Sequence, residues 1–220
     1  MLKELQLHGH VLYNSDVSIA CFDAVHRDFD RISLPPFFIP QIAETLKENV
    51  TIAALIDFPY GMSDTKIRQH ATLDCIHKGA TGIDLVINAH WLINDKKSMV
   101  QEDIATHKRI CDENDISLKV MVDYRRLRLP QIKTAFSILW NCGVRDAAVS
   151  TGHFMDSFID QFAILNVLKT SYVNKIQFVM NGTVATEGHL KQLDKEGFGI
   201  RLHSGHAARI LFPVKTISAV

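Results

Sequence analysis

"RDAAVSTGHF" (residues 145–154) contains the unit from which the fold is predicted. Its short apolar run, Ala147 to Val149, has the composition of a parallel strand that is buried on both faces. The polar loop that follows, Ser150-Thr151-Gly152, is suited to hold an anion at the end of that strand. The same succession of a buried strand and a polar end recurs along the chain.

Seven apolar, β-branched runs alternate with longer amphipathic segments. The runs lie at 31–35, 51–58, 82–88, 117–124, 146–151, 175–182 and 199–205, and a weaker one lies at 5–12. Residues typical of helix boundaries separate them, with Ser63, Pro130 and Thr186 at starts and Gly79, Gly143 and Gly197 at ends. This count predicts a (β/α)8 TIM barrel, formed by a single domain over 1–220. The alternative is an open doubly wound sheet, but no GxGxxG motif follows the first strands.

The composition excludes several classes of function. Lys and Arg together number 24 and balance 24 Asp and Glu, so no basic field indicates a nucleic-acid or membrane partner. The four cysteines lie far apart, which argues against a zinc motif or a disulfide-rich secreted domain. The N-terminus does not resemble a signal peptide, and no apolar run reaches the roughly 18 residues of a membrane span. We therefore expect a cytoplasmic protein with no cofactor and no metal.

Polar residues recur where the predicted strands end. In a TIM barrel the active site lies at the carboxyl ends of the strands. The residues at these ends are Asp57, Asp84, Asn88, Asp123, Tyr124, Ser150 to His153, Asn181, Gly182 and His203 to Gly205. The alternative interpretation is that each strand end is polar because it meets solvent. The recurrence of the set at one end favours a functional mouth.

These motifs, in their order, resemble the deoxyribose-5-phosphate aldolases, which are class I aldolases on a (β/α)8 barrel. The similar stretches include "IDFPYG" (56–61), "GIDLVIN" (82–88), "LKVMVD" (118–123), "VSTGH" (149–153), "FVMNGTVAT" (178–186) and "IRLHSGHA" (200–207). The match runs from about residue 30 to 210 in the right order and spacing. The resemblance implies the barrel fold and places Asp84 where the family keeps its catalytic aspartate.

The resemblance also implies that the family's two active-site lysines are absent. The family's sixth strand reads K-T-S-T-G, and its lysine forms a Schiff base; Ala148 stands at that position here. Val179 stands at the position of the second lysine, which lowers the pKa of the first. An imine requires a neutral primary amine beside the carbonyl, and we expect Lys119 at the opposite end of the barrel. Gly9 is expected where the family has an aspartate.

The phosphate end of the family's site is predicted to be retained. The residues expected to bind a phosphorylated sugar or similar small anion are Ser150, Thr151, Gly152, His153, Asn181, Gly182, Arg201, Ser204 and Gly205. Glycine amides and hydroxyl groups supply hydrogen-bond donors, and His153 and Arg201 add positive charge. The chain is thus interpreted as an aldolase homologue without Schiff-base activity that binds a phosphorylated small molecule, and a homodimer is expected.

Three other functions stay open. The first is an acid–base or metal-assisted enzyme that uses Asp57, Asp84, Asp123, His153 and His203. The second is a regulatory partner of an active aldolase, which would retain the family's tendency to self-associate. The third is a true deoxyribose-phosphate aldolase, which the absence of both lysines disfavours.

Overall fold

Eight parallel strands close into one barrel in the computed structural model, which describes residues 1–8, 12–46, 50–154, 156–172, 174–182, 184, 186–203 and 205–213 (backbone only at 205 and 206). The strands are β1 Lys3–Gln6, β2 Arg31–Leu34, β3 Thr51–Ile56, β4 Gly82–Val86, β5 Ser117–Met121, β6 Asp146–Ala148, β7 Gln177–Asn181 and β8 Gly199–Leu202. Each strand pairs with its neighbour in the chain, and β8 pairs with β1. The predicted barrel is confirmed, and closure excludes the open sheet.

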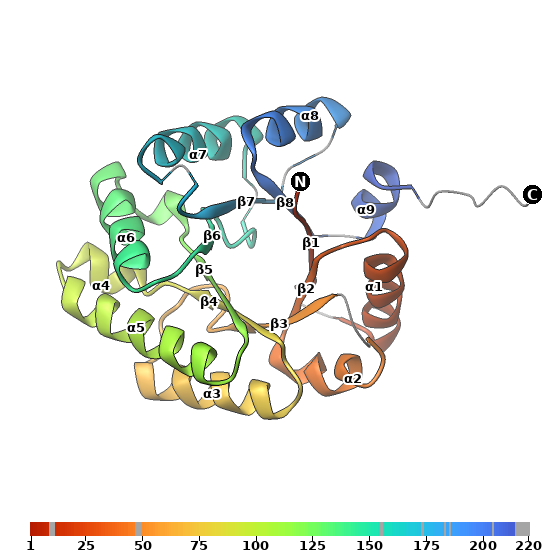
Figure 1. Cartoon of the computed structure of the whole chain (residues 1–220), viewed down its shortest axis with the longest axis horizontal. Helices are drawn as coiled ribbons and strands as arrows, with labels where there is room; N and C mark the ends of the chain where they lie inside the picture. Colours follow the sequence, from red (N-terminus) through yellow and green to blue (C-terminus); the bar gives the residue numbers. More distant parts are fainter. Residues whose placement is uncertain are drawn as a thin grey trace, which may run out of the picture.

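Helices surround the strands as an outer ring (Figure 1). Within the described ranges they are α1 Asn14–His26, η1 Pro36–Phe38, α2 Ile39–Ala43, α3 Thr65–His77, α4 Ala89–Ile93, α5 Lys97–Glu113, η2 Tyr124–Arg126, α6 Leu129–Asn141, α7 Phe158–Tyr172, α8 Glu187–Glu196 and α9 Gly205–Leu211. None of these helices is both long and apolar enough to span a bilayer.

Strand alternation separates two cores. In β4, Ile83 and Leu85 point outward and belong to the large apolar core between the strands and the helices. Asp84 and Val86 occupy the alternate positions and point into the barrel. The other strands follow the same alternation, so the interior receives one side chain in two from every strand. The functional question therefore concerns what fills the interior and the mouth above it.

Most predicted helix boundaries are confirmed. Pro130 lies in the first turn of α6, and Thr186 caps α8 by accepting a hydrogen bond from the His189 amide at 3.2 Å. Gly197 ends α8 with a left-handed φ of 73°, which glycine adopts without strain.

The prediction that Ser63 caps α3 is wrong. The helix begins at Thr65 and Asp64 holds the N-cap position, although its side chain makes no capping bond. Ser63 instead donates two hydrogen bonds to the Asp57 carboxylate, from its amide and its hydroxyl, both at 2.8 Å. The loop is therefore tied back to the end of β3 rather than to the helix.

Two predicted strands also differ from the structure. The first strand lies at Lys3–Gln6 and not at 5–12, because its ladder with β8 begins at Lys3. β6 ends at Ala148, so Ser150 and Thr151 belong to the loop that follows it. A run of apolar residues predicts a strand, but it does not show at which residue the hydrogen bonds to the neighbouring strands end.

Candidate functional site

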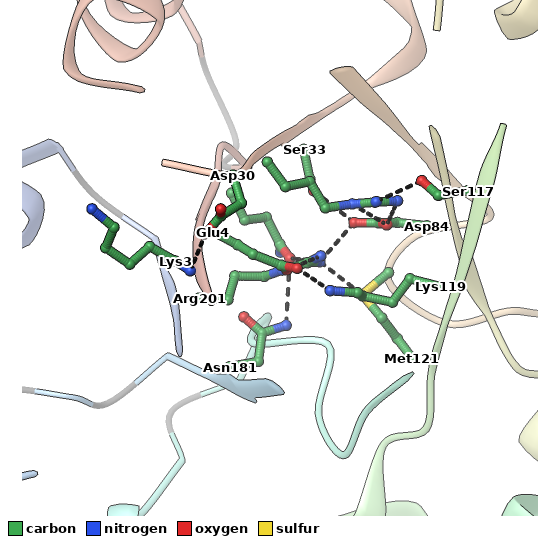
Figure 2. A network of polar contacts seen from close by, with 12 residues as sticks. Lys3, Glu4, Asp30, Ser33, Asp84, Ser117, Lys119, Met121, Asn181 and Arg201 are labelled. Atoms are coloured by element: carbon green, nitrogen blue, oxygen red, sulfur yellow. Dashed lines mark hydrogen bonds and ion pairs between the residues drawn. The ribbon is translucent and has the colours of Figure 1, made fainter. Parts of the chain in front are cut away.

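Charged side chains fill the lower part of the barrel interior (Figure 2). Glu4, Arg31, Asp84, Lys119 and Arg201 come from five different strands, and each is at most 6 % exposed. Arg201 bridges two carboxylates, with Nη2 at 2.6 Å from Glu4 Oε2 and Nη1 at 2.7 Å from Asp84 Oδ2. Arg31 contacts Asp84 at 2.6 Å, and Lys119 pairs with Glu4. We call these five residues the interior ion network.

Asp84, the aspartate that the family resemblance implies, is saturated by this network. Arg31 and Arg201 contact one carboxylate oxygen each, and Ser33 Oγ donates to the second oxygen at 2.6 Å. Burial opposes ionisation of Asp84, but Arg201 and Arg31 outweigh it and hold its pKa well below the usual range. Asp84 is therefore a permanent anion whose lone pairs are occupied by its own chain.

Arg201 does not lie in the predicted anion pocket. It is fully buried inside the barrel, and its guanidinium contacts Glu4, Asp84 and the side-chain oxygen of Gln6, the last at 3.0 Å. The prediction that Arg201 adds charge to that pocket is wrong, because the alternation of β8 turns its side chain inward. The neighbouring carboxylates raise its pKa despite burial.

Lys119 lies in the middle of β5 and not at its beginning. Of the lysines that the structure describes, it alone is buried, and burial lowers its pKa to about 8 against the opposing effect of Glu4. Its register partner on β6 is Asp146, whereas Ala148 pairs with Met121. The backbone of Lys119 is thus two residues further from the mouth than that of Ala148. Its amine is paired with Glu4.

The two positions at which the resemblance predicts the family's lysines are filled by small apolar side chains. Ala148 is fully buried and packs with Leu55, Val86 and Met121 in an apolar cluster inside the barrel. Val179 is its register partner on β7 and is equally buried. No amine or other nucleophile stands at either position.

The Ser150-Thr151-Gly152 loop is closed by its own hydrogen bonds. The Gly152 amide donates to Ser150 Oγ at 3.0 Å, and the His153 amide donates to Thr151 Oγ1 at 3.3 Å. Ser150 Oγ in turn donates to Asp156, and Gln6 Nε2 donates to the Thr151 carbonyl at 3.0 Å. The amides and hydroxyls predicted to bind an anion are engaged within the loop.

Gly182 and Asn181, on the neighbouring strand, are also engaged. The Gly182 amide donates to the Arg201 carbonyl at 3.0 Å. Asn181 Nδ2 donates to the Ser150 carbonyl at 2.9 Å, so β7 is joined to the loop after β6. Ser204 lies outside the described residues, as does Gly9, and Gly205 begins α9.

The His203 ring occupies the space between these loops. A Cβ added at Gly152 would lie 1.7 Å from His203 Cε1, and one added at Gly182 would lie 3.5 Å from the same atom. His203 Nε2 is also hydrogen-bonded to Asn181 Oδ1. The imidazole therefore lies over Gly152, in the space between the 150–153 loop and Gly182.

Three histidines and an aromatic side chain surround the mouth. The His8 ring lies 4.6 Å from His203 and 6.3 Å from His153, measured between centroids, and 5.2 Å from Phe58. Burial lowers the pKa of His8 to about 4 and that of His203 to about 3. Both rings are therefore neutral at pH 7 and make the mouth polar without adding positive charge to it.

The carboxylates of the acid–base alternative do not converge on these histidines. Asp57 is bound by Ser63 and lies 3.6 Å from Arg68 Nε. Asp123 caps the turn η2 by accepting from the Arg125 amide, while Asp84 lies in the interior ion network. In the described part of the chain no three His, Cys, Asp or Glu side chains are placed to hold a metal ion.

The mouth histidines make stability depend on pH. In the unfolded chain both rings titrate near pH 6.5, so between pH 6.5 and about 4 the unfolded state binds protons that the folded state does not. Their contribution to stability is complete above pH 6.5 and is lost as the pH falls toward 4. We expect the melting temperature to fall between pH 7.5 and 5, and His203→Asn to show a smaller fall in the same scan. Equal falls for the two proteins would contradict this assignment.

Comparison with known proteins finds relatives along nearly the whole chain. It is 27% identical over 221 residues to a deoxyribose-phosphate aldolase of Mycoplasmoides gallisepticum, across 99% of this chain and 95% of the relative. It is also 27% identical over 199 residues to that of Mycoplasmoides pirum, across 87% of this chain and 89% of the relative. Over nearly its whole length the chain is therefore similar to deoxyribose-phosphate aldolases. The solved structure of QR15, an aldolase, superposes with a TM-score of 0.83 at 19% identity, over 95% of this chain and 93% of that one, which shows the shared fold. No protein-family model matches.

The sequence interpretation missed much of the interior of this barrel. Glu4 and Gln6 alternate along β1, with His8 two residues after Gln6, as Arg31 and Ser33 do along β2. Polar residues at every second position of a buried parallel strand could have indicated a polar interior. Which of these residues pair with one another depends on barrel closure, and no local sequence pattern shows which strands become neighbours.

Proposed function

We propose that this aldolase-family barrel binds a small phosphorylated or similarly anionic ligand at its mouth and does not turn it over through a Schiff base. The observation that carries the proposal is that Ala148 and Val179 fill the layer where the amines are required. Imine formation needs a nucleophilic nitrogen beside the carbonyl, and neither side chain supplies one. Asp84, held by Arg31 and Arg201, is not free to exchange a proton with a ligand.

Support for ligand binding comes from the loops above this layer. The Ser150-Thr151-Gly152 sequence is retained, and His153 is half-buried beside it, with its ring 5.8 Å from Phe58 and 5.7 Å from Tyr60. Because the Gly152 and Gly182 amides are already bonded, side chains such as His153 would contribute more to holding the ligand than the amides. The predicted homodimer and the regulatory role stay predictions.

Deoxyribose 5-phosphate tests both parts of the proposal. We expect it to raise the melting temperature, which deoxyribose alone should not do, because ligand binding to the folded state stabilises it. Incubation with this ligand and borohydride should give no covalent adduct by mass spectrometry, and no aldehyde product should form. A deoxyribose-phosphate aldolase with both lysines, treated in parallel, shows that the trapping works.

Different outcomes contradict the two parts of the proposal, ligand binding and the loss of Schiff-base chemistry. An adduct mapped to Lys119, and absent from Lys119→Met, would show that the buried amine has replaced the missing lysines. Absence of any thermal shift would overturn ligand binding while leaving the loss of Schiff-base chemistry intact. A thermal shift of the same size in His153→Ala would show that His153 does not take part in binding the ligand.

A further inference from the structure

We propose that a second, independent pocket on the rim of the barrel binds a small molecule that carries a multivalent phosphate group. The pocket has a volume of about 360 Å³ and lies where η2 and the start of α6 meet the end of α4. Its lining residues are Ile93, Arg125, Arg126, Leu127, Arg128 and Gln131. Half of these residues are arginines, and none of the six carries a carboxylate.

Two of the three guanidinium groups lack a charged partner. In the part of the chain that the structure describes, no carboxylate lies within 4.0 Å of Arg126 or Arg128. Among the other arginines of the described residues, only Arg145 also lacks a carboxylate partner, and its guanidinium lies over the Trp140 ring. Arg125 contributes charge to the pocket as well, although it also pairs with Asp156 at 3.1 Å. Like charges gathered in one pocket repel one another unless an anion joins them.

Neutral groups hold Arg126 in place. Its Nη1 donates to the Tyr60 carbonyl at 2.7 Å, and its Nη2 lies 2.9 Å from His90 Nε2, which accepts when the His90 proton is on Nδ1. These two contacts orient the guanidinium without neutralising it. A preorganised arginine loses less conformational freedom when it binds, and its remaining N–H groups stay available for a ligand.

The start of α6 adds donors to the same pocket. The Arg128 amide donates to Gln131 Oε1 at 2.8 Å, so Gln131 keeps its side-chain NH₂ as a donor. The positive end of the helix dipole reinforces the arginines there. Forked guanidinium groups match the geometry of phosphate oxygens, and the volume exceeds what a single phosphate needs. The chemistry thus favours a pyrophosphate or a phosphorylated small molecule.

Pyrophosphate is the probe for this site, measured by isothermal titration calorimetry at low ionic strength. We expect a binding event that weakens at least about tenfold in Arg126→Gln/Arg128→Gln, since each charge-assisted hydrogen bond contributes severalfold to affinity. Arg145→Gln is the matched control, because it removes one surface arginine outside the pocket and should leave the affinity unchanged. Thermal unfolding of each variant checks that it is folded.

Three results would overturn the proposal: no binding of pyrophosphate to the wild-type protein, equal binding by the double variant, or tighter binding of citrate than of pyrophosphate. The third would show that the pocket prefers carboxylates. Any binding of pyrophosphate at the mouth is told apart by the variants, since neither Arg126 nor Arg128 belongs to the mouth and His153 does not line the rim pocket. His153→Ala should therefore keep the binding event that the double arginine variant loses, and loss of that event in the arginine variant alone leaves the proposed function untouched.

Discussion

Glu4→Gln is expected to lower the free energy of unfolding by about 3–5 kcal/mol, because removing one member of a buried ion pair leaves its partner charged and unpaired. Glu4 neutralises both Lys119 and Arg201 inside the barrel. With the carboxylate gone, three cations would remain against Asp84 and Asp146, and burial already raises the pKa of Asp146. Urea unfolding at pH 7.5, followed by circular dichroism, measures the change.

An exposed ion pair provides the matched control. Glu113 pairs with Arg109 at 2.7 Å on the surface of α5, where both side chains are more than half exposed. Glu113→Gln makes the same chemical change and should cost at most about 1 kcal/mol, because solvent screens the pair. If Glu4→Gln cost no more than Glu113→Gln, the interior ion network would contribute little to stability.

A second variant separates the ion pair from the loss of packing. Lys119→Met in the Glu4→Gln background removes the amine that would be left without its carboxylate. Since contacting residues couple, the double variant should be more stable than the sum of the two single changes predicts. Strict additivity would show that the two side chains do not stabilise each other.

Gly152→Ala is expected to cost about 2–5 kcal/mol, and it tests the contact between the 150–153 loop and His203. Gly152 has a φ of 71°, where an L side chain is strained by about 1–2 kcal/mol. The added Cβ would also lie 1.7 Å from His203 Cε1, and overpacking of this kind costs about 1–3 kcal/mol. The ring cannot easily move, because Nε2 bonds to Asn181 and His8 packs against it.

Removing the ring should rescue part of this loss. In a His203→Ala background, Gly152→Ala should cost only the backbone strain of about 1–2 kcal/mol. Gly188→Ala is the control. This glycine lies in α8, and a Cβ added to it would lie 3.6 Å from Thr186 Oγ1, which is an ordinary van der Waals contact. That change should stay within about 1 kcal/mol of the wild type or stabilise the helix. An equal cost of Gly152→Ala with and without the ring would mean that the contact is unimportant.

The predicted fold was recoverable from local patterns because each strand of this barrel carries its own signal. "GIDLVIN" is apolar enough to be buried on both faces, and β4 lies within it. Thr186, Pro130 and Gly197 mark helix boundaries through interactions that span only a few residues. The errors, at Ser63 and at the first strand, arise where a side chain or a strand is held by a partner distant in the chain.

The site was less predictable than the fold. Asp57 and Asp123 do follow β3 and β5 as predicted, whereas Asp84 lies in the middle of β4. The chemistry of these residues depends on what they bind. Asp84 and Arg201 were expected at a ligand-binding mouth, and instead they bind each other in the interior. His203 was expected to project near the mouth, and its ring also fills the space above Gly152.

By itself the sequence determined the barrel, the resemblance to the aldolases and the apolar side chains of Ala148 and Val179, since each rests on composition, order and local spacing. Only the tertiary structure decided that Glu4 meets Arg201, 197 residues further along the chain, and that Arg126 and Arg128 share a pocket without a carboxylate. Barrel closure decides the first, because it joins β1 to β8 and turns alternate side chains inward. The packing of α4 against α6 decides the second, because it brings Ile93 beside the three arginines.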